Sequence, residues 1–189
     1  RDFGKIGGTY YLTMPLIEGL DLRSLLQRCG GPLPIDVAAL IAHEVGAALE
    51  YIHRDERGIV HRDVSPENVF ITESCDVLLG DFGVAKARAR LGQTQAGQVK
   101  GKLPYLAPEQ VRGDPVTQRA DVFALGLLLF EMLTGRRANG GRNELESLAW
   151  ATNPRVVRPS RHVPSAAPLD GIVTRALARH PALRTRDAA

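Results

Sequence analysis

The feature that most constrains this chain is a pair of polar motifs at a fixed separation. Residues 61–68 read HRDVSPEN, and residues 81–83, which begin thirteen positions after Asn68, read DFG. Asp63, Asn68 and Asp81 offer hard oxygen ligands of the kind that magnesium prefers, and a carboxylate able to orient a hydroxyl. We therefore expect a fold that gathers these three side chains around magnesium-bound phosphates.

The residues between the two motifs predict how they meet. Two short apolar runs, 69–71 and 77–79, flank a polar turn at 72–76. This pattern predicts a β-hairpin with Asn68 and Asp81 at its two open ends. Two side chains that are distant in sequence would then be close enough to share a metal ion.

Hydrophobic spacing outside the motifs predicts a second hairpin and several helices. Residues 3–6 and 9–13 flank Gly7 and Gly8, a pair that tolerates the positive φ angles of a tight hairpin turn. Residues 84–103 have little periodicity, which is typical of a long functional or disordered loop. Helices are predicted from a cap at Asp21 to Gln27, and over 35–54, 119–134 (stopped by Gly135), 143–151 and 169–179.

Composition is that of an ordinary globular domain. The 189 residues are 44% hydrophobic and 24% charged, and a net charge of +3 implies neither nucleic-acid nor membrane binding. Cys29 and Cys75 lack metal-ligand spacing and are expected to be lone thiols. We find no secretory signal and no apolar stretch near the roughly 20 residues of a membrane span. We expect a cytoplasmic segment, whose parent protein could be membrane-tethered. Because the chain enters mid-pattern at Arg1, we expect it to be a fragment of that longer protein.

A third motif, APE at 107–109, completes a resemblance to bacterial-type serine/threonine protein kinases over nearly the whole chain. The resemblance implies an α+β fold, a mainly helical large lobe with short β-hairpins. Residues 1–18 would be a remnant of the small lobe and the hinge, and 19–189 a large lobe slightly truncated at its end. The implied cofactors are ATP and Mg²⁺, and the implied partner is a protein substrate.

The same resemblance assigns the phosphate side of the site. Asp63 would be the catalytic base that accepts the proton of the substrate hydroxyl, and Asn68 and Asp81 would hold the magnesium ions. For Asp63 or Asp81 taken alone, the capping of a turn remains an alternative.

The adenine side follows the first hairpin in this resemblance. Met14 would be the gatekeeper, the Pro15 carbonyl would accept from the adenine amine, and the Ile17 N–H would donate to the base. Asp21 would bind the ribose, and Phe70 would form the apolar floor under the base. Plain core packing remains an alternative for Met14 and Phe70.

Two structural contacts are implied as well. Asp121 would accept the backbone N–H groups of the turn at His61 and Arg62. Glu109 would pair with Arg184, in a stretch that resembles the closing motif of the family.

One hydroxyl in the long loop is a candidate switch. Thr94 is the only hydroxyl residue between Gly83 and Lys102, and kinases with an arginine at the position of Arg62 often pair it with a loop phosphate. We expect phosphate on Thr94 to order the loop. An unmodified, solvent-exposed Thr94 is the alternative.

The chain departs from the family pattern at two positions. Ser65 stands where such kinases usually carry a lysine that steadies the transferred phosphate, and Lys102 stands where they usually carry threonine. We expect Lys102 to restore the charge near Asp63; a solvated Lys102 beside a weakened site is the alternative. The exchange also weakens the assignment of the chain to kinases that act on Ser/Thr rather than Tyr hydroxyls.

Three readings of function follow. The first is an ATP- and magnesium-dependent protein kinase acting on Ser or Thr. The segment alone would bind ATP poorly, because no Gly-rich phosphate loop, strand lysine or paired helix glutamate precedes Arg1. The second is a non-catalytic, pseudokinase-like or remnant interaction module. A small-molecule phosphotransferase is a weaker third, because residues 107–109 resemble a peptide-substrate platform.

Overall fold

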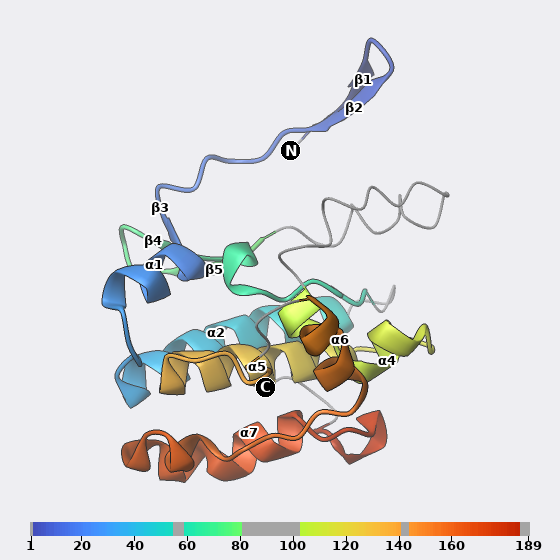
Figure 1. Cartoon of the computed structure of the whole chain (residues 1–189). Helices are drawn as coiled ribbons and strands as arrows, with labels where there is room; N and C mark the ends of the chain where they lie inside the picture. The colour runs from blue at the N-terminus through green and yellow to red at the C-terminus, as the bar shows by residue number, and fades with distance from the viewer. Residues whose placement is uncertain (1, 55–58, 81–102, 141–143, 186–189) are drawn as a thin grey trace.

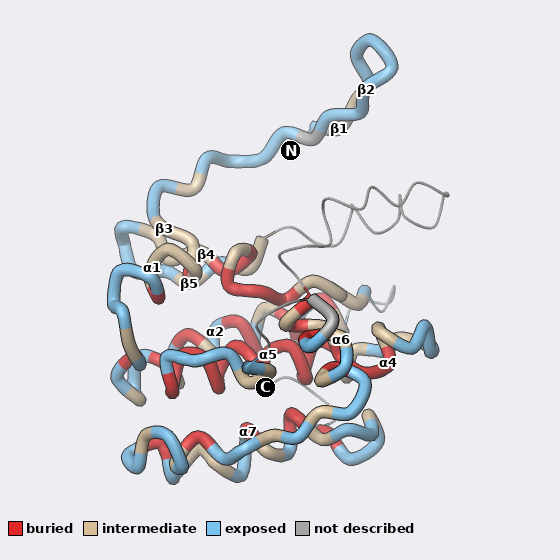
Figure 2. Tube along the Cα trace, in the orientation of Figure 1, coloured by how far each residue is buried: buried red, intermediate tan, exposed pale blue. Residues whose placement is uncertain are grey.

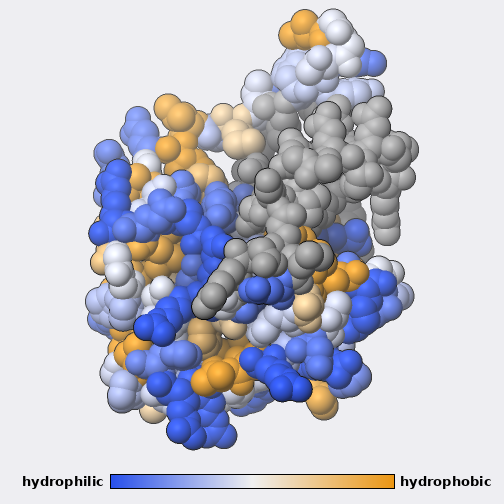
Figure 3. Space-filling view, viewed as in Figure 1, coloured by the Kyte–Doolittle hydropathy of each residue, from blue (hydrophilic) through white to orange (hydrophobic). Residues whose placement is uncertain are grey.

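The N-terminal hairpin extends away from the helical body in this computed structural model, which describes residues 2–54, 59–80, 103–140 and 144–185 (Figure 1). Strands β1 (Phe3–Ile6) and β2 (Thr9–Leu12) are antiparallel. Gly7 and Gly8 have φ angles of 54° and 87°, as a tight two-residue turn requires. This hairpin is confirmed, with its second strand one residue shorter than predicted. Figure 3 shows an apolar patch at its far tip, where Ile6 is 73% exposed.

A three-stranded antiparallel sheet lies at the edge of the body. Its order is β3 (Gly19–Asp21), β4 (Val69–Thr72) and β5 (Val77–Leu79). The β4–β5 hairpin is the predicted one, whereas β3 was not predicted. Strand β3 has only three residues, the first of which is a glycine, so it shows no alternating pattern. Its partner β4 lies about fifty positions away in the sequence.

Helix α1 (Leu22–Cys29) begins and ends on the signals that the sequence carries. Asp21 is its N-cap, with Oδ1 accepting from the Ser24 N–H at 2.7 Å. Gly30 adopts the left-handed conformation that closes the last turn, at φ 64°. The helix therefore runs two residues beyond the predicted end at Gln27.

Two long helices form the centre of the body, and both match their predicted bounds. In α2 (Ile35–Arg54) the inner face is buried, whereas the apolar residues Val37 and Leu40 are 39% and 56% exposed. Helix α5 (Arg119–Thr134) is buried on all sides from Ala120 onward (Figure 2). A helix that is apolar around its whole circumference belongs inside a domain, and α2 and α7 pack against it.

Short elements complete the body. They are the 3₁₀ turns η1 (Pro66–Asn68), η2 (Leu103–Tyr105), η3 (Pro159–Arg161), η4 (Pro164–Leu169) and η5 (Pro181–Leu183), and the helices α4 (Pro108–Arg112), α6 (Glu144–Thr152) and α7 (Asp170–Ala176). The prediction of a last helix reaching Arg179 was wrong. Arg184 takes the carbonyl oxygens of Ala178 and Arg179 at 2.8 and 3.2 Å, which draws this stretch out of the helix.

In the described part of the chain, every helix is too short or too polar to cross a membrane.

Candidate active site

The turn that precedes Asp63 is held by Asp121, as predicted. Asp121 lies in the first turn of α5, is 1% exposed, and accepts the N–H of His61 at 2.8 Å and that of Arg62 at 2.7 Å. His53 of α2 adds a bond from Nε2 to the same carboxylate at 2.9 Å. Arg62 has a φ of 64°, a left-handed conformation that costs a side-chain-bearing residue about 1–2 kcal/mol. The carboxylate therefore stabilises a strained turn.

Asp63 and Asn68 lie together. The Asn68 amide, which is 2% exposed, donates from Nδ2 to the Asp63 carbonyl oxygen at 2.7 Å. This bond orients the amide and leaves Oδ1, a hard oxygen of the kind magnesium prefers, as the atom that could bind a cation.

His61 connects this loop to the end of β5. Its ring is fully buried, with Nδ1 accepting from the Asp63 N–H at 3.3 Å and Nε2 donating to the Gly80 carbonyl at 3.0 Å. The Gly80 N–H in turn donates to the Asn68 carbonyl at 2.8 Å. The backbone just before Asp81 is thus bonded to Asn68, but Asp81 itself lies outside the described residues, and its metal role stays a prediction.

Two of the predicted nucleotide residues are neighbours across the sheet. Asp21 lies opposite Phe70 in the β3–β4 register. The Phe70 ring covers Gly80 so closely that a Cβ there would lie 2.8 Å from Cε2. Phe70 is half-buried and stands outside the core cluster. Both Asp21 oxygens already accept from Ser24, at 2.7 and 3.0 Å, so a ribose hydroxyl would share them.

The remaining adenine-side residues lie on the extended connection between β2 and β3. Met14 is 55% exposed, Pro15 is exposed and Ile17 is half-buried. Core packing, the alternative reading of Met14, is wrong for this structure. The structure brings Asp21, Phe70 and Asn68 together, and leaves the Met14 and Pro15 side chains in solvent.

Ser65, which replaces the family lysine, has an unusual environment. Its side chain is fully buried, and among the residues that the structure describes its Oγ meets no hydrogen-bond partner. A buried hydroxyl without a partner costs about 1–3 kcal/mol. Lys102, the second residue of the predicted charge exchange, lies outside the described residues. Thr94, the predicted switch, lies outside them as well.

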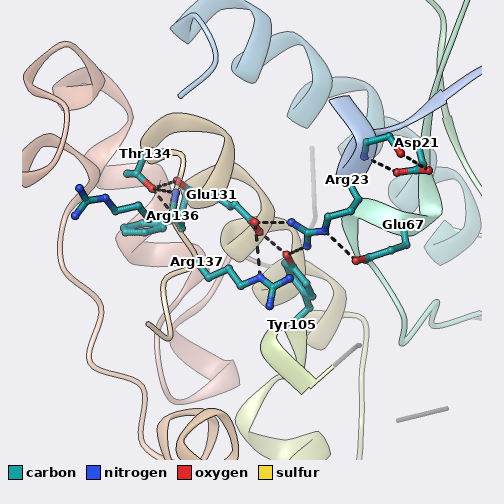
Figure 4. Close-up of polar contacts among 10 residues, drawn as sticks. Asp21, Arg23, Glu67, Tyr105, Glu131, Thr134, Arg136 and Arg137 are labelled. Carbon is teal, nitrogen blue, oxygen red and sulfur yellow. Dashed lines mark hydrogen bonds and ion pairs between the residues drawn. The ribbon is translucent and has the colours of Figure 1, made fainter. Parts of the chain in front are cut away.

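A charged cluster that sequence reasoning missed lies beside the loop (Figure 4). Arg23 of α1 donates from Nε to Glu67 at 3.0 Å and from Nη1 to Glu131 of α5 at 2.7 Å, and Nη2 bonds the Tyr105 hydroxyl. Tyr105 donates to the second Glu131 oxygen, and Arg137 lies 3.8 Å from the first. The cluster joins α1, the Asp63–Asn68 loop, η2 and α5.

The cluster alters two ionisations. Burial, and then the charge of Glu131, raises the pKa of Tyr105 well above its ordinary value near 10. Burial lowers the pKa of Arg23, but the interactions with Tyr105, Glu131 and Glu67 outweigh it, so the net pKa rises. Glu131 was the available signal, since an acid inside an apolar helix needs a partner. That partner lies 108 positions away.

The predicted pair of Glu109 and Arg184 is confirmed. Arg184 donates from Nη1 and Nη2 to the two Glu109 oxygens at 2.6 and 2.9 Å, and the two side chains are 0% and 3% exposed. This bidentate pair ties α4, which follows η2, to the C-terminal segment.

Comparison with known proteins gives consistent matches. Residues 3–168 match the sequence model of the protein kinase domain. Serine/threonine-protein kinase PknD of Mycobacterium tuberculosis is 40% identical over 97% of this chain and 28% of its own length. PknL of the same organism is 39% identical over 99% of this chain and 46% of its own length. The chain therefore spans less than half of these relatives.

The fold agrees with solved structures. The crystal structure of the Mycobacterium tuberculosis PknI kinase domain superposes with a TM-score of 0.72 at 32% identity, covering 99% of this chain and 64% of that one. The α+β architecture expected from the sequence is therefore confirmed.

Proposed function

Because this chain belongs to the protein kinase domain family, we propose that it is the large-lobe part of an enzyme that transfers the γ-phosphate of ATP to Ser or Thr hydroxyls of proteins. The observation that supports this best is the hydrogen-bonded unit of Asp63, Asn68 and His61, with Gly80 bonded to its far end. In the proposed division, residues 1–18 belong to the small lobe and hinge, and 19–189 to the large lobe.

In the proposed reaction, the substrate oxygen forms a bond to the γ-phosphorus while the bond to the bridging oxygen of ADP breaks, and the hydroxyl proton passes to Asp63. Bound magnesium would neutralise phosphate charge. Asn68 Oδ1 and Asp81 would hold it, and Phe70 would lie under the base. Lys102 would supply the positive charge that Ser65 lacks.

In the decisive experiment, the full-length protein is given Mg-ATP and a mixture of proteins as phosphate acceptors, and phosphate transfer to these proteins is measured. Asp63→Asn is expected to lower kcat by about 10²–10⁴-fold, since it removes the proton acceptor. Asp76→Asn, in the exposed β4–β5 turn, makes the same chemical change and should leave kcat unaltered. Full turnover by Asp63→Asn would refute the proposal.

Two further arms of that assay address the untested residues. Lys102→Met is expected to lower kcat about tenfold if its charge faces the transferred phosphate, and unchanged turnover removes that role. Phosphosite mapping of the active protein tests the Thr94 switch, which an unmodified Thr94 contradicts.

A non-catalytic interaction module is the second candidate. It is favoured by Ser65, which stands in place of a lysine and whose buried Oγ meets no partner in the described part of the chain. That candidate predicts no transfer by the full-length protein, with or without nucleotide binding. We also expect the 189-residue segment alone to be nearly inactive, since it contains no Gly-rich phosphate loop. For the same reason we expect the segment to bind Mg-ATP weakly, which a thermal-shift titration with Mg-ATP would check.

A further inference from the structure

The side chain of Gln110 spans from the start of α4 to the turn before Asp63. Its Oε1 accepts from the Ala107 N–H at 2.9 Å, and its Nε2 donates to the Arg62 carbonyl at 3.0 Å. Only this amide orientation fits, because a backbone N–H must meet an acceptor and a carbonyl must meet a donor. One bond is therefore a local helix cap, and the other crosses 48 positions of sequence.

The Arg62 residue is thereby held on both sides. Asp121 binds its N–H, and Gln110 binds its carbonyl. That carbonyl belongs to the same peptide group as the Asp63 N–H, which donates to His61 at 3.3 Å. Both polar atoms of the peptide group that leads into Asp63 are therefore anchored, and the plane of this group sets the direction of the Asp63 side chain.

The anchoring matters because the turn is strained. A left-handed residue that bears a side chain persists only where its surroundings hold it. Releasing the Arg62 carbonyl would free the Arg62–Asp63 peptide to rotate about ψ of Arg62 and φ of Asp63, next to a residue whose φ of 64° is already strained. A shift of about 1 Å in a reacting group can cost about 10²-fold in rate.

We propose that Gln110 is a positioning residue, which fixes Asp63 for phosphate transfer and couples its orientation to the segment at 107–109. This inference rests on the proposed function. A movement at the start of α4 is passed through the Gln110 amide to the Arg62–Asp63 peptide. The orientation of Asp63 therefore depends on the position of the segment at 107–109.

Gln110→Glu separates the two bonds of the amide. A carboxylate still accepts from the Ala107 N–H, as in a capping box, but has no hydrogen to give to the Arg62 carbonyl. Gln110→Met loses both bonds. Asn153→Asp, an amide-to-acid exchange at an exposed site on the loop after α6, is the matched control.

In the full-length protein, Gln110→Glu is expected to lower kcat about tenfold, with the KM for ATP and the melting temperature unchanged. Hydrogen exchange of residues 59–65 should become faster in this variant and stay unchanged in Asn153→Asp. Wild-type kcat or wild-type exchange in Gln110→Glu overturns the inference and leaves Gln110 as a helix cap. If the wild-type protein transfers no phosphate, the proposed function fails, and the exchange result still decides the positioning role.

Discussion

At the scale of the residue, buried charges in this molecule are held by several partners at once. Arg184 illustrates this. Besides the two Glu109 oxygens, its guanidinium binds the carbonyl oxygens of Arg119, Ala178 and Arg179, at 2.9, 2.8 and 3.2 Å, and lies 4.7 Å from the centre of the Phe123 ring. Such a group cannot be removed without leaving its acceptors unpaired.

Arg184→Ala is therefore expected to lower the free energy of unfolding by about 3–5 kcal/mol, because Glu109 becomes an uncompensated buried charge. Urea denaturation measures the change. Arg112→Ala is the control, since its ion pair with Asp114 is exposed at 37% and 48% and should contribute below about 1 kcal/mol. Equal stabilities of the two variants would contradict the assignment.

At the scale of the element, β3 is the strand that attaches the N-terminal part of the chain to the body. It pairs with β4 across Gly19–Thr72, Leu20–Ile71 and Asp21–Phe70. The approach is very close at its first residue, where a Cβ on Gly19 would lie 2.1 Å from the Ile71 carbonyl oxygen. Only glycine fits at this position without movement of the backbone.

Gly19→Ala should separate β3 from β4 and destabilise the molecule by about 1–3 kcal/mol. Hydrogen exchange should rise in residues 69–72. The control is Gly31→Ala, where a Cβ meets nothing within 4 Å and where we expect a neutral or slightly stabilising effect. Unchanged exchange at 69–72 in Gly19→Ala would show that the strand tolerates the methyl group.

At the scale of the whole molecule, the cluster around Arg23 connects parts that are far apart in the chain. The Tyr105 hydroxyl lies between Arg23 of α1 and Glu131 of α5, in a buried position. Loss of its proton would place a negative oxygen beside the Glu131 carboxylate, so the cluster makes folding depend on pH at the alkaline end.

The sign follows from the raised pKa of Tyr105. The folded state holds this proton more tightly than the unfolded state, so the stabilisation is complete below about pH 10 and is lost as the pH rises through the folded-state pKa. Absorbance titration should show Tyr105 ionising only as the protein unfolds. Tyr105→Phe should flatten the alkaline stability limb. Tyr51→Phe, at an 81% exposed position, should not.

Local patterns determined much of this molecule in advance. Both hairpins, the cap at Asp21 and the bounds of α2 and α5 follow from turn residues and hydrophobic periodicity, which act over a few positions. The family motifs predicted two further buried contacts, that of Asp121 with the His61–Arg62 turn and that of Arg184 with Glu109. The roles of Asp81, Thr94 and Lys102 stay predictions.

The tertiary structure alone decided what depends on pairing across the chain. Strand β3 exists because β4 lies beside it, the last helix ends early because Arg184 takes its carbonyl oxygens, and Gln110 reaches Arg62 only after α4 has packed. Arg23 looks like any surface arginine of a short helix until Glu131 lies opposite. The sequence can indicate that a buried charge or amide needs a hydrogen-bonding partner. Which residue becomes that partner is decided by the packing of elements distant in sequence.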